Sequence, residues 1–160
     1  MYVSELLKTY LQDHHAGATG GLELARRTAG ANEDTEYGPE LSRIADEIAA
    51  DREALEEVMQ RLEVSPSKLK DAGGWAAEKV GRLKPNNRLL SYSSLSRVLE
   101  IEGLVLGVTG KQALWEGLQT ALGETLDGIS FSELSARAAD QRSRLEALRR
   151  TAAAEAFEAS

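Results

Sequence analysis

The segment that decides the fold runs from Leu95 to Leu122 and reads LSRVLEIEGLVLGVTGKQALWEGLQTAL. At 100° per residue, its apolar residues form two stripes on opposite sides of one helix. The stripe that we predict faces the core consists of Leu95, Val98, Leu99, Val105, Leu106, Thr109 and Ala113, with Glu102 in its middle. The second stripe consists of Ile101, Leu104, Val108, Trp115 and Leu122. Because a helix that is apolar on two sides is normally covered on two sides, we predict the central helix of a bundle.

The composition of the chain favours an all-α protein. Of its 160 residues, 42% are hydrophobic, 28% are charged and only 5% are aromatic, with three prolines. Ala, Leu, Glu and Arg predominate, and this mixture favours helix over sheet. A chain of this length is expected to form one domain with a substantial core, here residues 1–160.

Charge and cysteine content exclude several classes of protein. A net charge of −7 argues against general nucleic-acid binding, which needs a basic surface. The absence of cysteine excludes disulfides, thiolate catalysis and Cys-based zinc sites. The first helix is too polar for a signal peptide, and no apolar run reaches the roughly 18 residues that a membrane span needs. We therefore expect a cytoplasmic protein with no membrane span.

Helical periodicity extends over most of the chain. Helices are predicted at about residues 4–29, 39–63, 93–122 and 131–158. Pro39 suits the first turn of the second helix, and Ser130 with Glu133 has the pattern of a capping box for the fourth. Residues 64–92 form a long crossover with a short helix at about 66–84. Two antiparallel helical hairpins joined by a long, partly helical crossover make a four-helix bundle with one crossover connection.

The two predicted hairpins repeat each other's pattern. A shift of 88 residues places His14 on Glu102, and a shift of 90 places Asp51 on Gln141. The apolar positions of the helices fall in register under the same shifts. The polar interruptions therefore coincide together with the apolar stripes, as expected for a duplicated hairpin.

Three segments carry a resemblance to a known family: QDHHAGATGGLELARR (12–27), GGWAAEKVGRLKP (73–85) and RVLEIEGLVLGVTGKQALW (97–115). With the hairpin–crossover–hairpin layout, the whole chain resembles the ferritin-like superfamily, and more narrowly an uncharacterised group of its bacterial members. This resemblance implies a ferritin-like four-helix bundle. It also implies where a metal centre would lie, because metal-binding members hold di-iron or di-manganese with a Glu from each of two helices and Glu-x-x-His from the other two.

The chain departs from that ligand pattern. By the resemblance, the single-ligand positions hold His14 and Glu102, and the Glu-x-x-His positions hold Ile48 with Asp51 and Ala138 with Gln141. A carboxylate-bridged metal pair needs about six donors, most of them anionic. The neighbouring Arg52 and Arg142 would also repel a cation. We therefore predict that the di-metal centre is degenerate and expect no cofactor.

The hypothesis that we favour is a non-catalytic structural or interaction protein. In it, a buried polar network fixes the register of the helices. The network consists of His14, Glu102 and Arg149, with Asp51 and Arg52. Counting residues along the helices places Arg149 level with Glu102, which predicts a buried ion pair. The protein partner is unknown, but we expect a homodimer through helical faces that include Trp115. The alternative cover for that stripe is the crossover.

Two other functions remain open. In the first, His14, Glu102 and Asp51 hold a single iron or manganese ion, and His15, which we interpret as a surface residue, adds a donor. In the second, a small molecule or lipid binds between the glycine-lined helices. Hydrolase or transferase chemistry has no supporting motif, so we do not expect an enzyme.

Overall fold

The computed structural model describes residues 2–68 and 91–158. Within them the chain forms four helices, α1 (Glu5–Ala31), α2 (Gly38–Arg61), α5 (Ser94–Leu122) and α6 (Phe131–Glu158). The all-α prediction is confirmed, and the helix bounds differ from the predicted ones by at most two residues. The predicted helix at 66–84 lies almost wholly outside the described residues. No described helix has a stretch long and apolar enough to cross a membrane.

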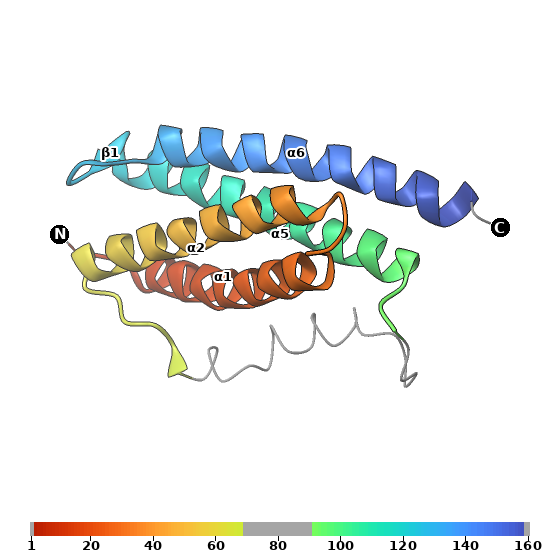
Figure 1. The fold of residues 1–160 in the computed structure, drawn as a ribbon. Helices are drawn as coiled ribbons and strands as arrows, with labels where there is room; N and C mark the ends of the chain where they lie inside the picture. Colours follow the sequence, from red (N-terminus) through yellow and green to blue (C-terminus); the bar gives the residue numbers. More distant parts are fainter. Residues whose placement is uncertain (1, 69–90, 159–160) are drawn as a thin grey trace.

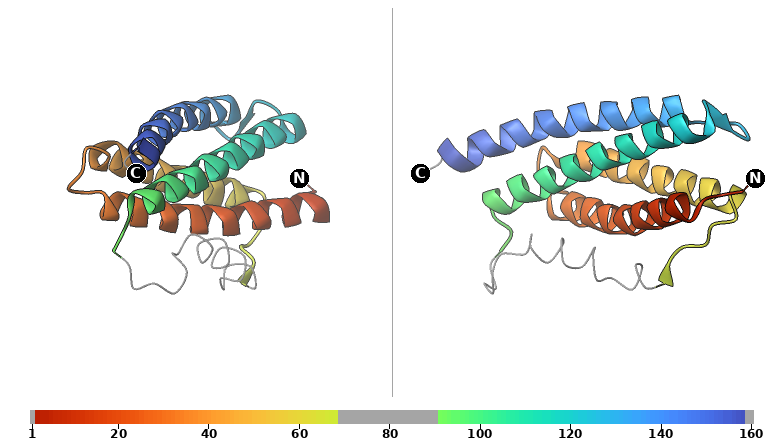
Figure 2. Two further views of the ribbon diagram at one scale, coloured as in Figure 1. Left: turned by 90° about the vertical axis from the view of Figure 1, so that its right-hand side faces the viewer. Right: turned by 180° about the vertical axis from the view of Figure 1, so that it is seen from behind.

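The helices pair as two antiparallel hairpins, α1 with α2 and α5 with α6 (Figure 1). α2 and α5 run in the same direction, so the last residue of α2 and the first residue of α5 lie at opposite ends of the bundle (Figures 1 and 2). α5 packs most extensively on α6 and also packs on α1. It is therefore the helix that joins the two hairpins.

Local sequence sets the helix ends. The Ser4 hydroxyl accepts a hydrogen bond from the Leu7 amide at 3.2 Å and caps α1. At the start of α5, Ser93 and Ser96 exchange hydrogen bonds between their side chains and backbone amides in a capping box. The first residue of α2 is Gly38, and the position needs glycine because a Cβ there would lie 2.6 Å from the Asn32 carbonyl oxygen.

A small β-hairpin replaces the loop that was predicted before the last helix. Strand β1 (Thr125–Leu126) pairs antiparallel with β2 (Ile129–Ser130). The two residues between them, Asp127 and Gly128, both have positive φ, 46° and 90°. Asp-Gly at these positions is the sequence pattern of a tight two-residue hairpin turn. The chain thus reverses between α5 and α6 in a defined geometry.

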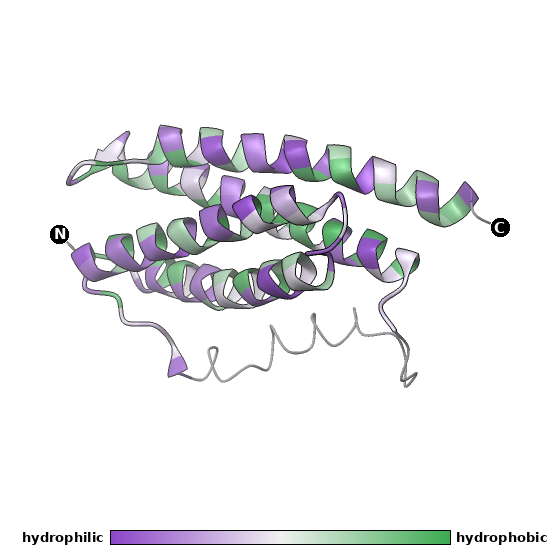
Figure 3. Cartoon of the chain, in the orientation of Figure 1, coloured by the Kyte–Doolittle hydropathy of each residue, from purple (hydrophilic) through white to green (hydrophobic). Residues whose placement is uncertain are grey.

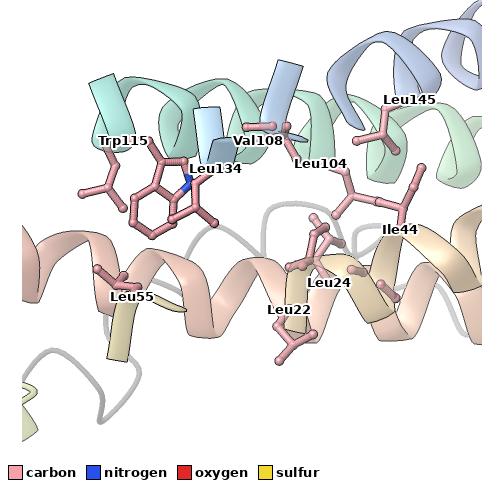
Figure 4. Close-up of a cluster of buried hydrophobic side chains, with 14 of the residues drawn as sticks. Leu22, Leu24, Ile44, Leu55, Leu104, Val108, Trp115, Leu134 and Leu145 are labelled. Carbon is pink, nitrogen blue, oxygen red and sulfur yellow. The ribbon is translucent and has the colours of Figure 1, made fainter. Parts of the chain in front are cut away.

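The apolar core lies between all four helices (Figure 4). Figure 4 labels side chains from each helix: Leu22 and Leu24 of α1, Ile44 and Leu55 of α2, Leu104, Val108 and Trp115 of α5, and Leu134 and Leu145 of α6. At one end, the Trp115 indole stacks on the Phe131 ring with 6.4 Å between ring centroids.

The predicted orientation of the central helix is wrong. The second stripe faces the core, since Ile101, Leu104, Val108 and Trp115 are all at most 3% exposed. Most of the first stripe faces outward, and Leu106 is 74% exposed. Trp115 is fully buried within its own chain, so it presents no surface to a second copy in this structure. Hydropathy could not choose between two apolar stripes on one helix, whereas packing against α6 and α1 does.

Candidate functional site

The main polar site lies around Asp51, whose side chain is 1% exposed. Asp51 is on α2, and its carboxylate meets Lys111 of α5 and two residues of α6. Oδ2 accepts hydrogen bonds from Lys111 Nζ at 2.5 Å and from Gln141 Nε2 at 2.9 Å. Oδ1 accepts from Arg137 Nε at 2.6 Å, and Arg137 Nη2 also donates to it. One carboxylate therefore ties three helices together.

Lys111, Asp51 and Gln141 form a closed ring of hydrogen bonds. Lys111 donates both to the Asp51 carboxylate and to the Gln141 side-chain oxygen, while the Gln141 amide donates to Asp51. Gln141 is fully buried and uses both ends of its amide in this ring. Such saturation of buried polar atoms avoids the penalty for unpaired donors and acceptors.

The site is cationic overall. Lys111 and Arg137 carry two positive charges against the single negative charge of Asp51. Burial lowers the pKa of the Lys111 ammonium, and the attraction of Asp51 opposes that effect. We call Asp51, Lys111, Arg137 and Gln141 the central network.

The two adjacent histidines are placed opposite to the prediction. His15 is the core residue, with 2% exposure, and its Nε2 lies 2.9 Å from Glu56 Oε1. His14 is half-buried and packs edge-on against the Tyr10 ring, with 4.6 Å between ring centroids. Burial lowers the pKa of His14, and the nearby Asp13 carboxylate opposes that effect. Leu11, Leu22 and Ala25 of the predicted stripe are buried, and the burial of α1 extends to the side of His15.

The predicted Glu102–Arg149 ion pair is not formed. Both residues are half-buried, and the Arg149 guanidinium instead donates to Glu146 one turn earlier, at 2.9 and 3.0 Å. This bond raises the pKa of Arg149, to which the Glu102 charge adds only a minor attraction. Arg52 is likewise not part of the central network, because it bonds Thr19 at 3.2 Å and Glu56 at 3.0 Å.

The structure does not bring His14, Glu102 and Asp51 together. Among the described residues, no group of three His, Asp or Glu side chains is arranged to hold a metal ion. Of the three, only Asp51 lies in the central network, and its carboxylate is already bonded to two cationic side chains. The three donors that the sequence suggested for a metal ion are therefore not arranged around a common position.

A second buried carboxylate, Glu100, was missed by the sequence analysis. It is 5% exposed, accepts a hydrogen bond from Thr28 Oγ1 at 2.7 Å and lies 3.5 Å from Arg27 Nε. These contacts join α5 to α1. Lys111 was also missed, although it and Glu100 both fall on the stripe of Leu104 and Trp115. With that stripe facing the core, helical spacing alone would have indicated both residues.

A third cluster closes the end of the bundle near the α1–α2 turn. Buried Asn32 donates to the Tyr92 hydroxyl at 2.9 Å and accepts from Arg97 Nε at 2.6 Å. The Arg97 guanidinium lies 4.7 Å above the centroid of the Tyr37 ring. The Tyr37 hydroxyl donates to Glu155 Oε2 at 2.7 Å, which connects α6 to the turn.

Tyr37 should make the stability of the protein fall at alkaline pH. Burial, followed by the hydrogen bond to Glu155, raises the pKa of this 2%-exposed residue from 10.0 to about 12. Between these values the folded state holds a proton that the unfolded state has lost, so stability falls as pH rises. Tyr37→Phe has no phenol to titrate at this position, so its free energy of unfolding should fall by about 2 to 3 kcal/mol less over this pH range. Urea unfolding of both proteins between pH 10 and about 12 measures it, with Tyr2→Phe, at a 92%-exposed tyrosine, as the control.

Ion pairs also line the seam between α2 and α6. The Arg144 guanidinium bonds Glu40 at 3.0 Å and also bonds Glu47, both on α2. These bonds raise the pKa of Arg144. With the Arg137–Asp51 pair, they connect two helices whose backbones make few close contacts. Charged side chains thus supply contacts between α2 and α6 in addition to those of the apolar core.

An open surface pocket lies on the outer side of α5 and α6, lined by Gln112, Ala139, Arg142, Ser143, Glu146, Ala147 and Arg150. In the view of Figure 3, hydrophilic and hydrophobic residues alternate along α6. This charged, open hollow does not match the apolar cavity between helices that a lipid would need.

No family model, curated protein or solved structure matches the chain. What the protein does must therefore be inferred from the central network and from the surfaces of the described helices.

Proposed function

We propose that this protein is a ferritin-like bundle in which an internal ion-pair network replaces the di-metal centre, and that it acts as a non-catalytic structural or interaction protein. The observation that carries the proposal is the central network. Its carboxylate, Asp51, is bonded to a lysine and an arginine.

The position of the network supports this interpretation. Asp51 and Gln141 stand where the ferritin-like resemblance places the histidines of the two Glu-x-x-His motifs. They also coincide under the 90-residue shift between the hairpins, and in the structure they bond each other at 2.9 Å. The parallel direction of α2 and α5, with a long connection between them, agrees with the same architecture.

The charges of the network argue against a metal ion in the same place. A divalent cation would have to compete with the Lys111 ammonium for Asp51 and would be repelled by the nearby Arg137 guanidinium. Gln141 offers a neutral oxygen, which already accepts from Lys111. The ammonium therefore supplies the positive charge that a carboxylate at this depth requires.

Elemental analysis tests the proposal. The protein would be purified without a histidine tag from cells supplemented with iron and manganese, in parallel with Asp51→Asn and His14→Ala. We expect less than about a tenth of an equivalent of either metal in all three proteins, because the donors that remain free do not form a site. A stoichiometric metal that is lost in Asp51→Asn or His14→Ala would overturn the proposal in favour of a divergent metal-binding protein.

A further inference from the structure

The outward side of α5 is apolar over most of its length. The residues at heptad-like spacing on this side are Leu95, Leu99, Glu102, Leu106, Thr109 and Ala113, with Gly110 beside them. Leu95 is 50% exposed, Leu99 37% and Leu106 74%. We call this set the outer α5 face. It contains one charged residue, in a chain that is 28% charged.

The side chains of this face are distributed unevenly along the helix. The large ones, Leu95 and Leu99, lie toward the N-terminal end, and the small Thr109 and Ala113 lie toward the C-terminal end. A Cβ added at Gly110 would meet no atom within 4 Å, so the space over this position is open. If a second copy lies antiparallel, with the two-fold axis near Leu106, the leucines of each copy meet the small residues of the other.

We propose that the outer α5 face binds the same face of a second copy in an antiparallel homodimer. This inference deepens the proposed interaction role and supplies a contact that does not involve Trp115. Two copies with a net charge of −7 each repel one another, and the repulsion is smallest where the surface is nearly uncharged. An isologous contact of this kind needs one self-complementary patch, which the large-to-small gradient provides.

The size of the face predicts a weak dimer. From Leu95 to Ala113 the helix extends about 27 Å at 1.5 Å per residue, and one helix face of that length buries less than the roughly 1,200 to 2,000 Å² of a standard interface. We therefore expect a dissociation constant in the micromolar range. Sedimentation equilibrium over a broad range of concentrations should show a reversible monomer–dimer equilibrium.

Cross-linking tests the antiparallel arrangement. The chain has no cysteine, so Leu99→Cys and Ala113→Cys each introduce a single thiol. In the proposed dimer, residue 99 of one copy is level with residue 113 of the other, whereas two residues 99 are about 21 Å apart along the axis. A bis-maleimide that spans about 10 Å should therefore link the mixed variants and neither variant alone. Links within each single variant would show a parallel pair and overturn the proposal.

A charged substitution tests whether this face forms the contact. Leu106→Glu should raise the dissociation constant about tenfold or more, because it places two carboxylates at the axis. Its circular dichroism and melting temperature should stay unchanged, since the residue is mostly exposed. Thr151→Glu, at an exposed position of α6, is the matched control and should leave dimerisation intact.

A monomer at all concentrations would overturn the proposal and favour the crossover as the cover of this face. That outcome would leave the metal-free role of the central network, tested by elemental analysis, unaffected.

Discussion

Asp51→Asn should lower the free energy of unfolding by about 3 to 5 kcal/mol, which is a large share of the stability of a domain of this size. The substitution preserves the shape of the side chain but removes its charge. The Lys111 ammonium, whose side chain is 15% exposed, then stays buried without a counter-ion. Arg137 is 39% exposed and turns to solvent more easily, so most of the penalty comes from Lys111. Urea unfolding at neutral pH, followed by helical circular dichroism, measures the loss.

Two further variants separate the ion pair from a general effect of mutation. Asp46→Asn removes an exposed carboxylate from the same helix and should change stability by less than about 0.5 kcal/mol. Lys111→Met, added to Asp51→Asn, removes the uncompensated charge and should recover at least about 1 kcal/mol. A loss below about 1 kcal/mol in Asp51→Asn alone would mean that the central network does not hold the helices together.

Trp115→Ala should also cost about 3 to 5 kcal/mol, because it leaves a cavity beside Phe131 at one end of the core. Trp115 is 0% exposed, so its loss should not change the association of the protein. Thermal unfolding and sedimentation of the same samples measure the two effects. A stable variant that dissociates would instead place Trp115 at an interface, as the sequence first suggested.

Trp115→Phe is the matched control for that experiment. It keeps an aromatic ring against Phe131 and removes an indole N–H that has no hydrogen-bond partner within the described structure. The free-energy cost of the reduced packing is therefore partly offset, because a buried and unpaired N–H donor is removed. We expect a stability between those of the parent protein and Trp115→Ala. A loss as large as that of Trp115→Ala would show that ring size alone dominates.

The sequence was sufficient to locate the four described helices and to orient α2 and α6, but not to orient α5. Helical periodicity, Pro39 and the short polar loops indicate where each helix begins and ends, because these are local properties. The orientation of α5 depends on which of two apolar stripes the neighbouring helices cover. That choice is made by tertiary packing, and the composition of the two stripes is too similar to reveal it.

The wrong orientation predicted for α5 also led to wrong predictions for the buried polar residues. With the face around Glu102 assigned to the core, Glu102 was expected to be the buried carboxylate and Lys111 was overlooked. In α1, the predicted stripe contributes to the core, but His15 is buried and His14 is only half-buried. Asp51 and Gln141 lie on helices that each have one clear apolar side, and both are buried in the structure. Their partner Lys111 comes from the helix whose orientation was ambiguous.

The tight turn at Asp127–Gly128 bears on the order in which the bundle assembles. Its backbone geometry is set by two adjacent residues, and the loop that joins α5 to α6 closes at little entropic cost. Among the described helices, the pair with the most extensive packing, α5 and α6, is also a pair of chain neighbours. Contacts between chain neighbours form faster than those that wait for a distant segment to return. The α5–α6 hairpin is thus suited to be the folding nucleus on which the α1–α2 hairpin docks.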